Sequence, residues 1–321
     1  MNYTSEEFAN ALRNVRKIMD PSPVIKSKWL SDLLSADVYL KLECLNPGHS
    51  FKIRGAINTL LSQEATPNFV VTASGGNHGL GVAIASASQG IRCKVFLPIN
   101  TSKYRIDLLT ALGAEVELVG EAWDEANEVA LRFAENTSSL YIHPFADPKV
   151  ILGQGTIVNE LVEQVGEFDS IFVSVGGGGL ISGIVRNLES QGLLDRTDVY
   201  AVETIGADCL NQSIKARKLI TLPTIKSIAK TLGARKTTPE IFEYLQKRLS
   251  GSFTVSDKEA VQAMLDMLNH EKILVEPATS CVIAALDSID LHGKCVVIVV
   301  CGSNVSFEEL LKWTEDFGIS F

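Results

Sequence analysis

The chain has 321 residues, which is enough for two domains of ordinary size or one large α/β body with a full hydrophobic core. Hydrophobic residues make up 46% and charged residues 21% of the chain, proportions that are typical of globular proteins and exclude a disordered one. The formal net charge of −9 disfavours nucleic acid and anionic membrane surfaces as partners, because both are negatively charged.

No apolar stretch reaches the roughly 20 residues that a transmembrane helix needs. The N-terminal sequence MNYTSEEFANAL carries acidic residues where a secretory signal would have a basic stretch followed by an apolar one. The six cysteines form no C-x-x-C pair, which argues against a zinc site and a disulfide framework. We therefore expect a cytoplasmic protein that binds neither membranes nor nucleic acid.

Short stretches rich in β-branched residues alternate with longer stretches of helical periodicity. The expected strands, in chain order, are Val38–Cys44, Phe69–Ala73, Arg92–Leu97, Glu115–Val119, Ile171–Val175, Val199–Val202 and Cys295–Val300. Capping-box signatures mark the starts of three helices: Thr4-x-x-Glu7, Ser256-x-x-Glu259 and Ser306-x-x-Glu309. Strands that alternate with helices predict βαβ units and an α/β fold with parallel sheets.

Two turn-rich clusters, Asn46-Pro47-Gly48 and the stretch 143–148 with its two prolines, divide the chain. Between them the pattern reads as strands and helices in strict alternation. We expect a small domain of residues 56–145, inserted in a large domain that combines residues 1–55 and 146–321.

Four consecutive glycines, Gly176, Gly177, Gly178 and Gly179, follow the expected strand Ile171–Val175 and precede a helix. Their unobstructed N–H groups and the positive end of the helix dipole would hold an anion, most naturally a phosphate. A tight turn could require one or two glycines but not four. Neither the Rossmann nor the Walker A pattern is met, which favours the phosphate of a cofactor over a nucleotide.

A second glycine segment, Ser74-Gly75-Gly76-Asn77-His78, also runs from a strand into a helix. The side chains of Ser74 and Asn77, together with the free backbone N–H groups, can donate to another anion, and a small carboxylate is the natural candidate. An ordinary helix N-terminus would explain the segment equally well.

Lys52 lies between Phe51 and Ile53 at the expected start of a helix, where the helix dipole disfavours positive charge. Burial and the dipole would both lower its pKa, which is the condition for a lysine that forms a Schiff base. A solvated surface lysine is the ordinary alternative. Beside a phosphate site and a carboxylate site, such a lysine describes an amino acid held on pyridoxal phosphate.

Four motifs in this order, SFKIRGA, SGGNHG, VGGGGLISG and VVCGSN, resemble those of the fold type II pyridoxal-phosphate-dependent enzymes. Within them the chain is most similar to the serine/threonine dehydratase and serine racemase group, over nearly its whole length. The resemblance implies a fold like that of the tryptophan synthase β subunit, with two open twisted sheets flanked by helices and a small domain inserted in a large one. It also implies a homodimer.

The resemblance assigns a role to each motif residue. Lys52 would form the Schiff base with the cofactor, Phe51 would pack against its pyridine ring and Asn77 would bond its phenolic oxygen. Cys301 stands where the family places a Ser or Cys against the pyridine nitrogen. The phosphate would bind Gly176, Gly177, Gly178 and Gly179. The substrate carboxylate would bind Ser74, Gly75, Gly76, Asn77 and His78.

The resemblance further implies a lyase that converts L-threonine or L-serine to a 2-oxo acid and ammonia by α,β-elimination. A thiol at Cys301 cannot keep the pyridine nitrogen protonated as a carboxylate would, which favours elimination over a long-lived carbanion. The racemases carry a serine where this chain has Gly75, so dehydration is favoured over serine or aspartate racemisation. A β-replacement synthase of the cysteine-synthase kind and a non-catalytic binding module with the same fold stay open.

Three further segments have both a functional and an ordinary explanation. The resemblance implies a divalent ion, because many members of the group bind one. Glu203, the carbonyl of Ala207 and Asp208 would suit Mg²⁺ or Ca²⁺ as ligands. Their spacing is one residue shorter than in the racemases, and a solvated acidic loop is the alternative. Lys230 replaces the usual Asp, and it would either bind an extra anionic group, as in 3-hydroxyaspartate, or point to solvent. Glu276 belongs to a segment that resembles one near the family's active site, which a helix with proline in its first turn explains as well.

Overall fold

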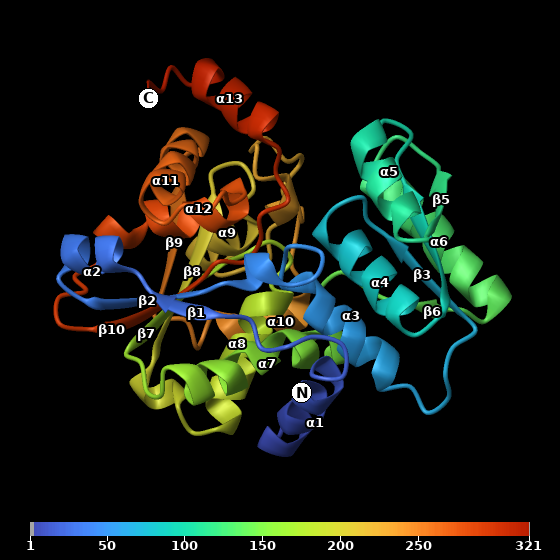
Figure 1. Ribbon diagram of the computed structural model, residues 1–321, viewed down its shortest axis with the longest axis horizontal. Coiled ribbons are helices and arrows are strands. Elements are labelled where there is room, and N and C mark those ends of the chain that lie inside the picture. The colour runs from blue at the N-terminus through green and yellow to red at the C-terminus, as the bar shows by residue number, and fades with distance from the viewer. Residues whose placement is uncertain (1–2, 321) are drawn as a thin grey trace.

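The computed structural model describes residues 3–320 and arranges them around two sheets with helices on their faces (Figure 1). The larger sheet has six strands in the order β1 (Val24–Lys26), β2 (Asp37–Lys41), β10 (Cys295–Val299), β7 (Ser170–Ser174), β8 (Asp198–Thr204) and β9 (Gly251–Val255). The smaller sheet has four, in the order β5 (Glu115–Leu118), β4 (Arg92–Leu97), β3 (Phe69–Ala73) and β6 (Leu140–Tyr141). These strands pair in parallel, apart from β1 with β2.

The expected α/β fold is confirmed, and each of the seven expected strands is present. Strands β7 and β10 are buried along nearly their whole length, as their apolar sequences predict. The expected strand Val38–Cys44 is too long, because residues 43–45 form the 3₁₀ helix η1 (Glu43–Leu45), which carries the Glu43 side chain into the interior. The sequence pattern does not indicate β1, β6 and β9, which are edge strands that are short or half-buried.

The helices are α1 (Ser5–Val15), α2 (Lys28–Leu34), α3 (Lys52–Leu61), α4 (Asn77–Ser88), α5 (Lys103–Ala111), α6 (Trp123–Thr137), α7 (Pro148–Gln164), α8 (Gly179–Ser190), α9 (Cys209–Ala216), α10 (Pro239–Leu245), α11 (Asp257–His270), α12 (Pro277–Ala284) and α13 (Phe307–Asp316). Short 3₁₀ helices are η2 (Leu194–Arg196), η3 (Lys230–Leu232) and η4 (Leu286–Ser288). The three expected capping boxes are confirmed at the starts of α1, α11 and α13. Within residues 3–320, no helix has both the length and the apolar character needed to cross a bilayer.

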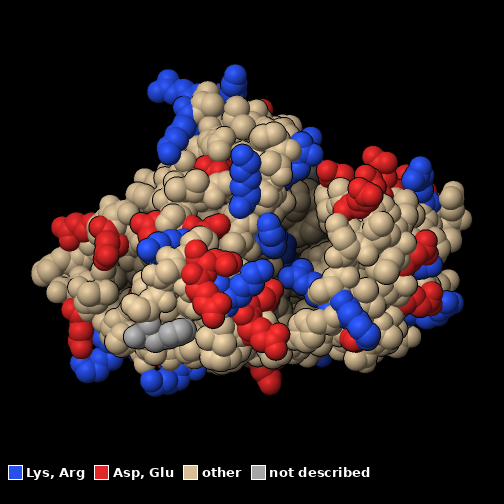
Figure 2. All heavy atoms as spheres, turned by 90° about the horizontal axis from the view of Figure 1, so that it is seen from above, with Lys and Arg blue, Asp and Glu red and all other residues tan. Residues whose placement is uncertain are grey.

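Helices cover both faces of each sheet. On the larger sheet, α11 and α12 lie on one face and α7 and α8 on the other (Figure 1). On the smaller sheet, the side chains of Val71 and Phe96 pack in one cluster with α6, whereas Val70 and Val95 pack in another with α4. This division follows from the alternation of side chains along a strand. In Figure 2 a furrow separates the body built on the larger sheet from the one built on the smaller sheet.

Helix α3 connects the two bodies, because it packs on α4 of the smaller body and on α7 of the larger one. Glycines permit both contacts. A Cβ at Gly81 of α4 would lie 2.9 Å from the backbone nitrogen of Ile53, and a Cβ at Gly153 of α7 would lie 2.6 Å from the carbonyl oxygen of Arg54. The start of α3 is therefore held between the two bodies at backbone distance.

A buried ion cluster anchors α3 to the larger body. The Arg54 guanidinium donates to both oxygens of Glu43, at 2.6 and 2.8 Å, and to both oxygens of Glu160, each at 2.7 Å. Lys41 Nζ donates to Glu160 at 2.6 Å. All four side chains are fully buried, and the charges of the two cations and two anions cancel. Burial raises the pKa of Glu160, but the charges and hydrogen bonds of Arg54 and Lys41 lower it overall.

The substitution Arg54→Met is expected to lower the free energy of unfolding by about 3–5 kcal/mol, because it leaves the buried Glu43 carboxylate without a cationic partner and removes one of the two cations that pair with Glu160. Lys28→Met, which breaks the exposed pair with Asp32, is the matched control and should cost less than about 1 kcal/mol. Urea unfolding followed by circular dichroism measures both. Equal stability of the two variants would contradict the anchoring role.

Candidate active site

Lys52 is the first residue of α3, as expected. Its Nζ donates to the carbonyl oxygen of Pro144 at 2.7 Å and lies 5.1 Å from the centre of the Phe51 ring. Burial lowers the pKa of Lys52 to about 8, although the nearby Cys301 and Glu276 partly oppose the shift. Near neutral pH the neutral fraction of this amine is therefore larger than that of an ordinary lysine, and the neutral form is the one that attacks a carbonyl carbon or removes a proton.

The four-glycine loop connects the end of β7 to the start of α8. Gly178 has a φ of +91°, which favours glycine, and a Cβ at Gly177 would lie 2.3 Å from the Phe145 ring. Within residues 3–320, no backbone N–H of Gly176, Gly177, Gly178 or Gly179 donates a hydrogen bond. These N–H groups and the positive end of α8 form a site for an anion such as phosphate.

The second glycine loop connects the end of β3 to the start of α4. The N–H of Gly76 donates to Ser74 Oγ at 3.3 Å, while those of Gly75, Asn77 and His78 donate to no atom of the described chain. They are available for a carboxylate at the positive end of α4. The structure thus places both predicted anion loops at the carboxyl ends of parallel strands, where α/β proteins bind ligands.

Arg105, on α5, is a residue at this loop that the sequence did not indicate. Its Nη1 lies 3.8 Å from the position that a Cβ on Gly76 would take. The half-buried guanidinium makes no hydrogen bond or ion pair with residues 3–320. Its positive charge lies beside free N–H groups, which is a setting that suits a carboxylate.

Glu276 proves to belong to the site, through a set of buried amide and hydroxyl contacts. Asn77 Nδ2 donates to both Glu276 oxygens, at 2.9 and 3.1 Å, and Thr231 Oγ1 donates to one of them at 3.0 Å. Asn304 Nδ2 donates to Asn77 Oδ1 at 2.7 Å. Burial raises the pKa of Glu276, and the hydrogen bonds of Asn77 and Thr231 oppose that rise. The orientation of the Asn77 amide is thus set from both ends.

The Cys301 thiol follows β10 and is also buried between two hydroxyls. Ser174 Oγ lies 3.3 Å and Thr279 Oγ1 3.2 Å from its sulfur. Burial and the negative charge of Glu276 raise the pKa of Cys301 to about 12, so the group stays a neutral thiol at physiological pH. Neither Ser174 nor Thr279 was indicated by a motif, since each lies in an apolar stretch of sequence.

Two histidines lie near Lys52 and are held neutral. Burial and the positive charge of Lys52 lower the pKa of His78 to about 3 and that of His143 to about 4. His78 Nε2 lies 3.0 Å from the carbonyl oxygen of Ile142. His143 Nδ1 accepts hydrogen bonds from the N–H groups of Phe145 and Ala146.

The three expected metal ligands lie at the end of β8 and the start of α9. Glu203 is fully buried and accepts hydrogen bonds from the N–H groups of Leu210, at 3.0 Å, and Asn211, at 2.6 Å, so a solvated loop does not describe it. Burial raises the pKa of Glu203 to about 8. Asp208 accepts from the N–H of Gly206 at 3.2 Å, and Ala207 is buried. Residues 3–320 contain no group of three or more His, Cys, Asp or Glu side chains arranged to hold a metal.

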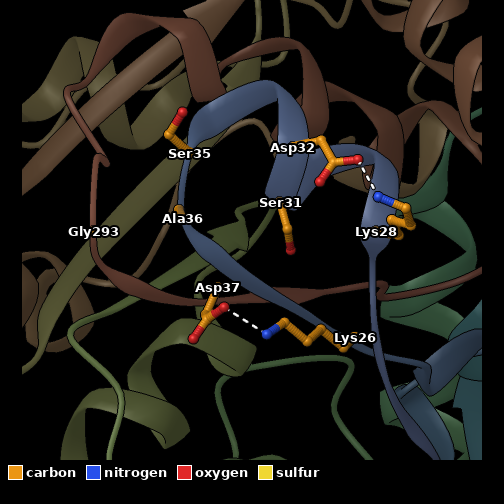
Figure 3. Close-up of a pocket in the computed structure, with 8 residues that line it drawn as sticks. All are labelled: Lys26, Lys28, Ser31, Asp32, Ser35, Ala36, Asp37 and Gly293. Carbon is orange, nitrogen blue, oxygen red and sulfur yellow. Dashed lines mark hydrogen bonds and ion pairs between the residues drawn. The ribbon is translucent and has the colours of Figure 1, made fainter.

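A separate cavity of about 530 Å³ lies beside α2 (Figure 3). Its charged groups are already paired, Lys26 with Asp37 and Lys28 with Asp32. The cavity borders the start of β2, at the edge of the larger sheet opposite to the one that carries the glycine loop.

Lys230, whose role was open, is exposed on η3.

Comparisons with known proteins agree on one family. The profile of the family described as "Pyridoxal-phosphate dependent enzyme" matches residues 15–302. The L-serine dehydratase/L-threonine deaminase of Bos taurus is 37% identical over 93% of this chain and 95% of its own. The processed form of threonine deaminase isoform 2 from Solanum lycopersicum superposes with a TM-score of 0.90 and 30% identity, over 98% of this chain and 88% of that one.

The structure of maize serine racemase is equally similar, with a TM-score of 0.90 and 29% identity over 98% of both chains. The family match covers nearly the whole chain, and the relatives share both its length and its two-sheet architecture. The chain therefore belongs to the pyridoxal-phosphate-dependent enzymes of fold type II.

Proposed function

We propose that this chain is a pyridoxal-phosphate-dependent ammonia-lyase that converts L-threonine or L-serine to a 2-oxo acid and ammonia. The observation that carries the proposal is the amine of Lys52, with its lowered pKa, placed among two sets of free backbone N–H groups and a neutral thiol. The relatives named serine dehydratase and threonine deaminase support the same activity. The family resemblance supports a homodimer, and the free cysteines support a cytoplasmic location, as further parts of the proposal.

The residues of the site suit the cofactor. The N–H groups of residues 176–179 would hold its phosphate, Lys52 would hold its aldehyde carbon, and Phe51 would lie against its ring. Asn77, fixed by Glu276 and Asn304, would donate to its phenolic oxygen. Cys301 would meet its pyridine nitrogen. The bound cofactor supplies an electron-withdrawing ring that stabilises negative charge on the Cα atom of the amino acid.

The chain's own groups would then perform an elimination. The N–H groups of Gly75, Asn77 and His78 hold the substrate carboxylate, which orients the Cα–H bond. The neutral amine of Lys52 accepts the Cα proton as a general base. The Cα–H electron pair forms the new double bond while the Cβ–O bond breaks, and the hydroxyl takes up one proton and leaves as water. The enamine product tautomerises to an imine, and addition of a water molecule releases the 2-oxo acid and ammonia.

Two residues favour elimination over racemisation, which is the second candidate function because a serine racemase is among the structural relatives. The buried thiol of Cys301 stays neutral, so it does not supply the ring nitrogen with the counter-charge that a lasting carbanion requires. Gly75 has no side chain that could return a proton to the opposite face of Cα. A 3-hydroxyaspartate substrate is the other alternative, and the exposure of Lys230 gives it no support.

The purified protein, incubated with pyridoxal phosphate, is expected to release 2-oxo acid and ammonia from L-threonine and L-serine. Lys52→Ala should lose at least roughly three orders of magnitude in kcat, because the base is gone. Condensation of the wild-type protein with the cofactor should become faster as the pH rises towards about 8, since the pKa of Lys52 is lowered to that value and the neutral amine reacts.

The same assay would separate the alternatives. Accumulation of D-serine from L-serine without oxo acid would establish a racemase instead, and faster turnover of 3-hydroxyaspartate than of threonine would change the substrate. A protein that binds pyridoxal phosphate but turns over none of these amino acids would contradict the lyase proposal.

Arg105→Gln is expected to raise KM for L-threonine roughly tenfold with little change in kcat, because a charged hydrogen bond to the substrate carboxylate is lost. Arg92→Gln is the control, since Arg92 lies on the same body but pairs with Glu115 in solvent. Steady-state kinetics of oxo acid release measures both. An unchanged KM in Arg105→Gln would show that this guanidinium does not bind the substrate.

We propose in addition that Glu203, the Ala207 carbonyl and Asp208 bind a divalent ion. Asn211, whose N–H already donates to Glu203, supports this with a buried Oδ1 that lacks a hydrogen-bond partner among the described residues. Chelation is expected to lower the melting temperature, and added Mg²⁺ or Ca²⁺ to restore it, in the wild type but not in Asp208→Asn. A melting temperature that is the same with chelator and with either ion would exclude the site.

A further inference from the structure

The turn between β6 and α7, residues 143–146, is built around one imidazole. His143 Nδ1 accepts hydrogen bonds from the N–H groups of Phe145, at 3.1 Å, and Ala146, at 2.9 Å. The side chain thus bonds the backbone two and three positions further on, which is the pattern of an asparagine or aspartate turn. The imidazole holds the shape of this turn.

The two middle residues of the turn reach different parts of the active site. The Pro144 carbonyl accepts the hydrogen bond of Lys52 Nζ at 2.7 Å. Phe145 lies against the four-glycine loop, because a Cβ on Gly177 would be 2.3 Å from its ring and one on Gly179 would be 2.6 Å from its carbonyl oxygen. A shift of the turn would therefore move both the partner of the reactive amine and one wall of the phosphate site.

The contacts of His143 also define its protonation. Because Nδ1 accepts two N–H groups, the proton of the neutral ring is on Nε2. Tyr141 and Phe145 meet the ring edge-on, with centroids at 6.3 and 4.7 Å. Burial and the charge of Lys52 keep the ring neutral at physiological pH, so that Nδ1 stays an acceptor.

We propose that His143 is a positioning residue for the amine of Lys52. Through its acceptor atom Nδ1 it presents the Pro144 carbonyl to Lys52 whenever that amine is not covalently occupied, and it keeps Phe145 on the glycine loop. Lys52 is thus held in place when it first reacts with the cofactor and when it bonds to the cofactor again after each turnover. The inference rests on the proposed function, in which Lys52 is the reacting amine.

The test compares substitutions that keep or remove the acceptor. His143→Asn retains an oxygen that can accept the same two N–H groups, whereas His143→Leu fills similar space without an acceptor. Stopped-flow spectroscopy measures the rate at which the cofactor-free protein condenses with pyridoxal phosphate, and thermal unfolding of the same samples measures stability. We expect His143→Leu to condense roughly tenfold more slowly than wild type and His143→Asn to recover most of the rate. kcat should follow the same order, with KM nearly constant.

Each outcome decides the question separately from the proposed lyase activity. Equal condensation rates in wild type and His143→Leu would overturn the inference, and so would equal impairment in His143→Leu and His143→Asn, which would mean that only the ring's packing matters. If His143→Leu does not fold, His143→Phe, which keeps a flat ring but has no acceptor atom, takes its place with the same expected result. A wild-type protein that fails to condense with pyridoxal phosphate would instead contradict the proposed function.

Discussion

The proposed chemistry of this protein depends on shielding one lysine amine from much of the surrounding water. Lys52 has its lowered pKa because it begins α3 at the junction of the two bodies, where both α4 and α7 approach the helix at backbone distance. Burial disfavours the charged form of an amine, so the neutral form of Lys52 becomes more populated. The buried cluster around Arg54, two residues further along the same helix, ties the start of α3 to η1 and α7 through paired charges.

The other groups of the candidate site follow different strands, and the groups after each strand differ in chemistry. The loop after β7 has free N–H groups that we propose bind a phosphate, and the loop after β3 has free N–H groups that we propose bind a carboxylate. The segment after β10 supplies a thiol that burial keeps neutral. Since the two loops belong to different sheets, the cofactor and substrate ends of the site are carried by different bodies. Lys52 lies on α3, the helix that joins the two bodies, and from there its amine is near the proposed binding groups of both.

The residues that sequence reasoning found are those whose chemistry depends on the local chain. Four successive glycines after an apolar strand leave their N–H groups unobstructed by side chains of their own. The residues next to Lys52 are sufficient to indicate that it begins a helix. The same holds for the capping boxes of α1, α11 and α13, which need only residues three positions apart. The edge strands β1, β6 and β9 were not found, because pairing at a sheet edge requires no strong pattern.

By itself, then, the order of residues determined the α/β fold, the two anion loops, the amine and, through resemblance, the cofactor family. Only the tertiary structure decided that Glu276 orients Asn77 and that Arg105 lies beside Gly76 without an ion pair among the described residues. It also decided that His143 holds the turn next to Lys52, and that Glu203 is buried rather than solvated. The reason is physical. A side chain's burial and partners come from segments distant in sequence, and no local pattern encodes which charge will meet which acceptor once the helices and sheets have packed.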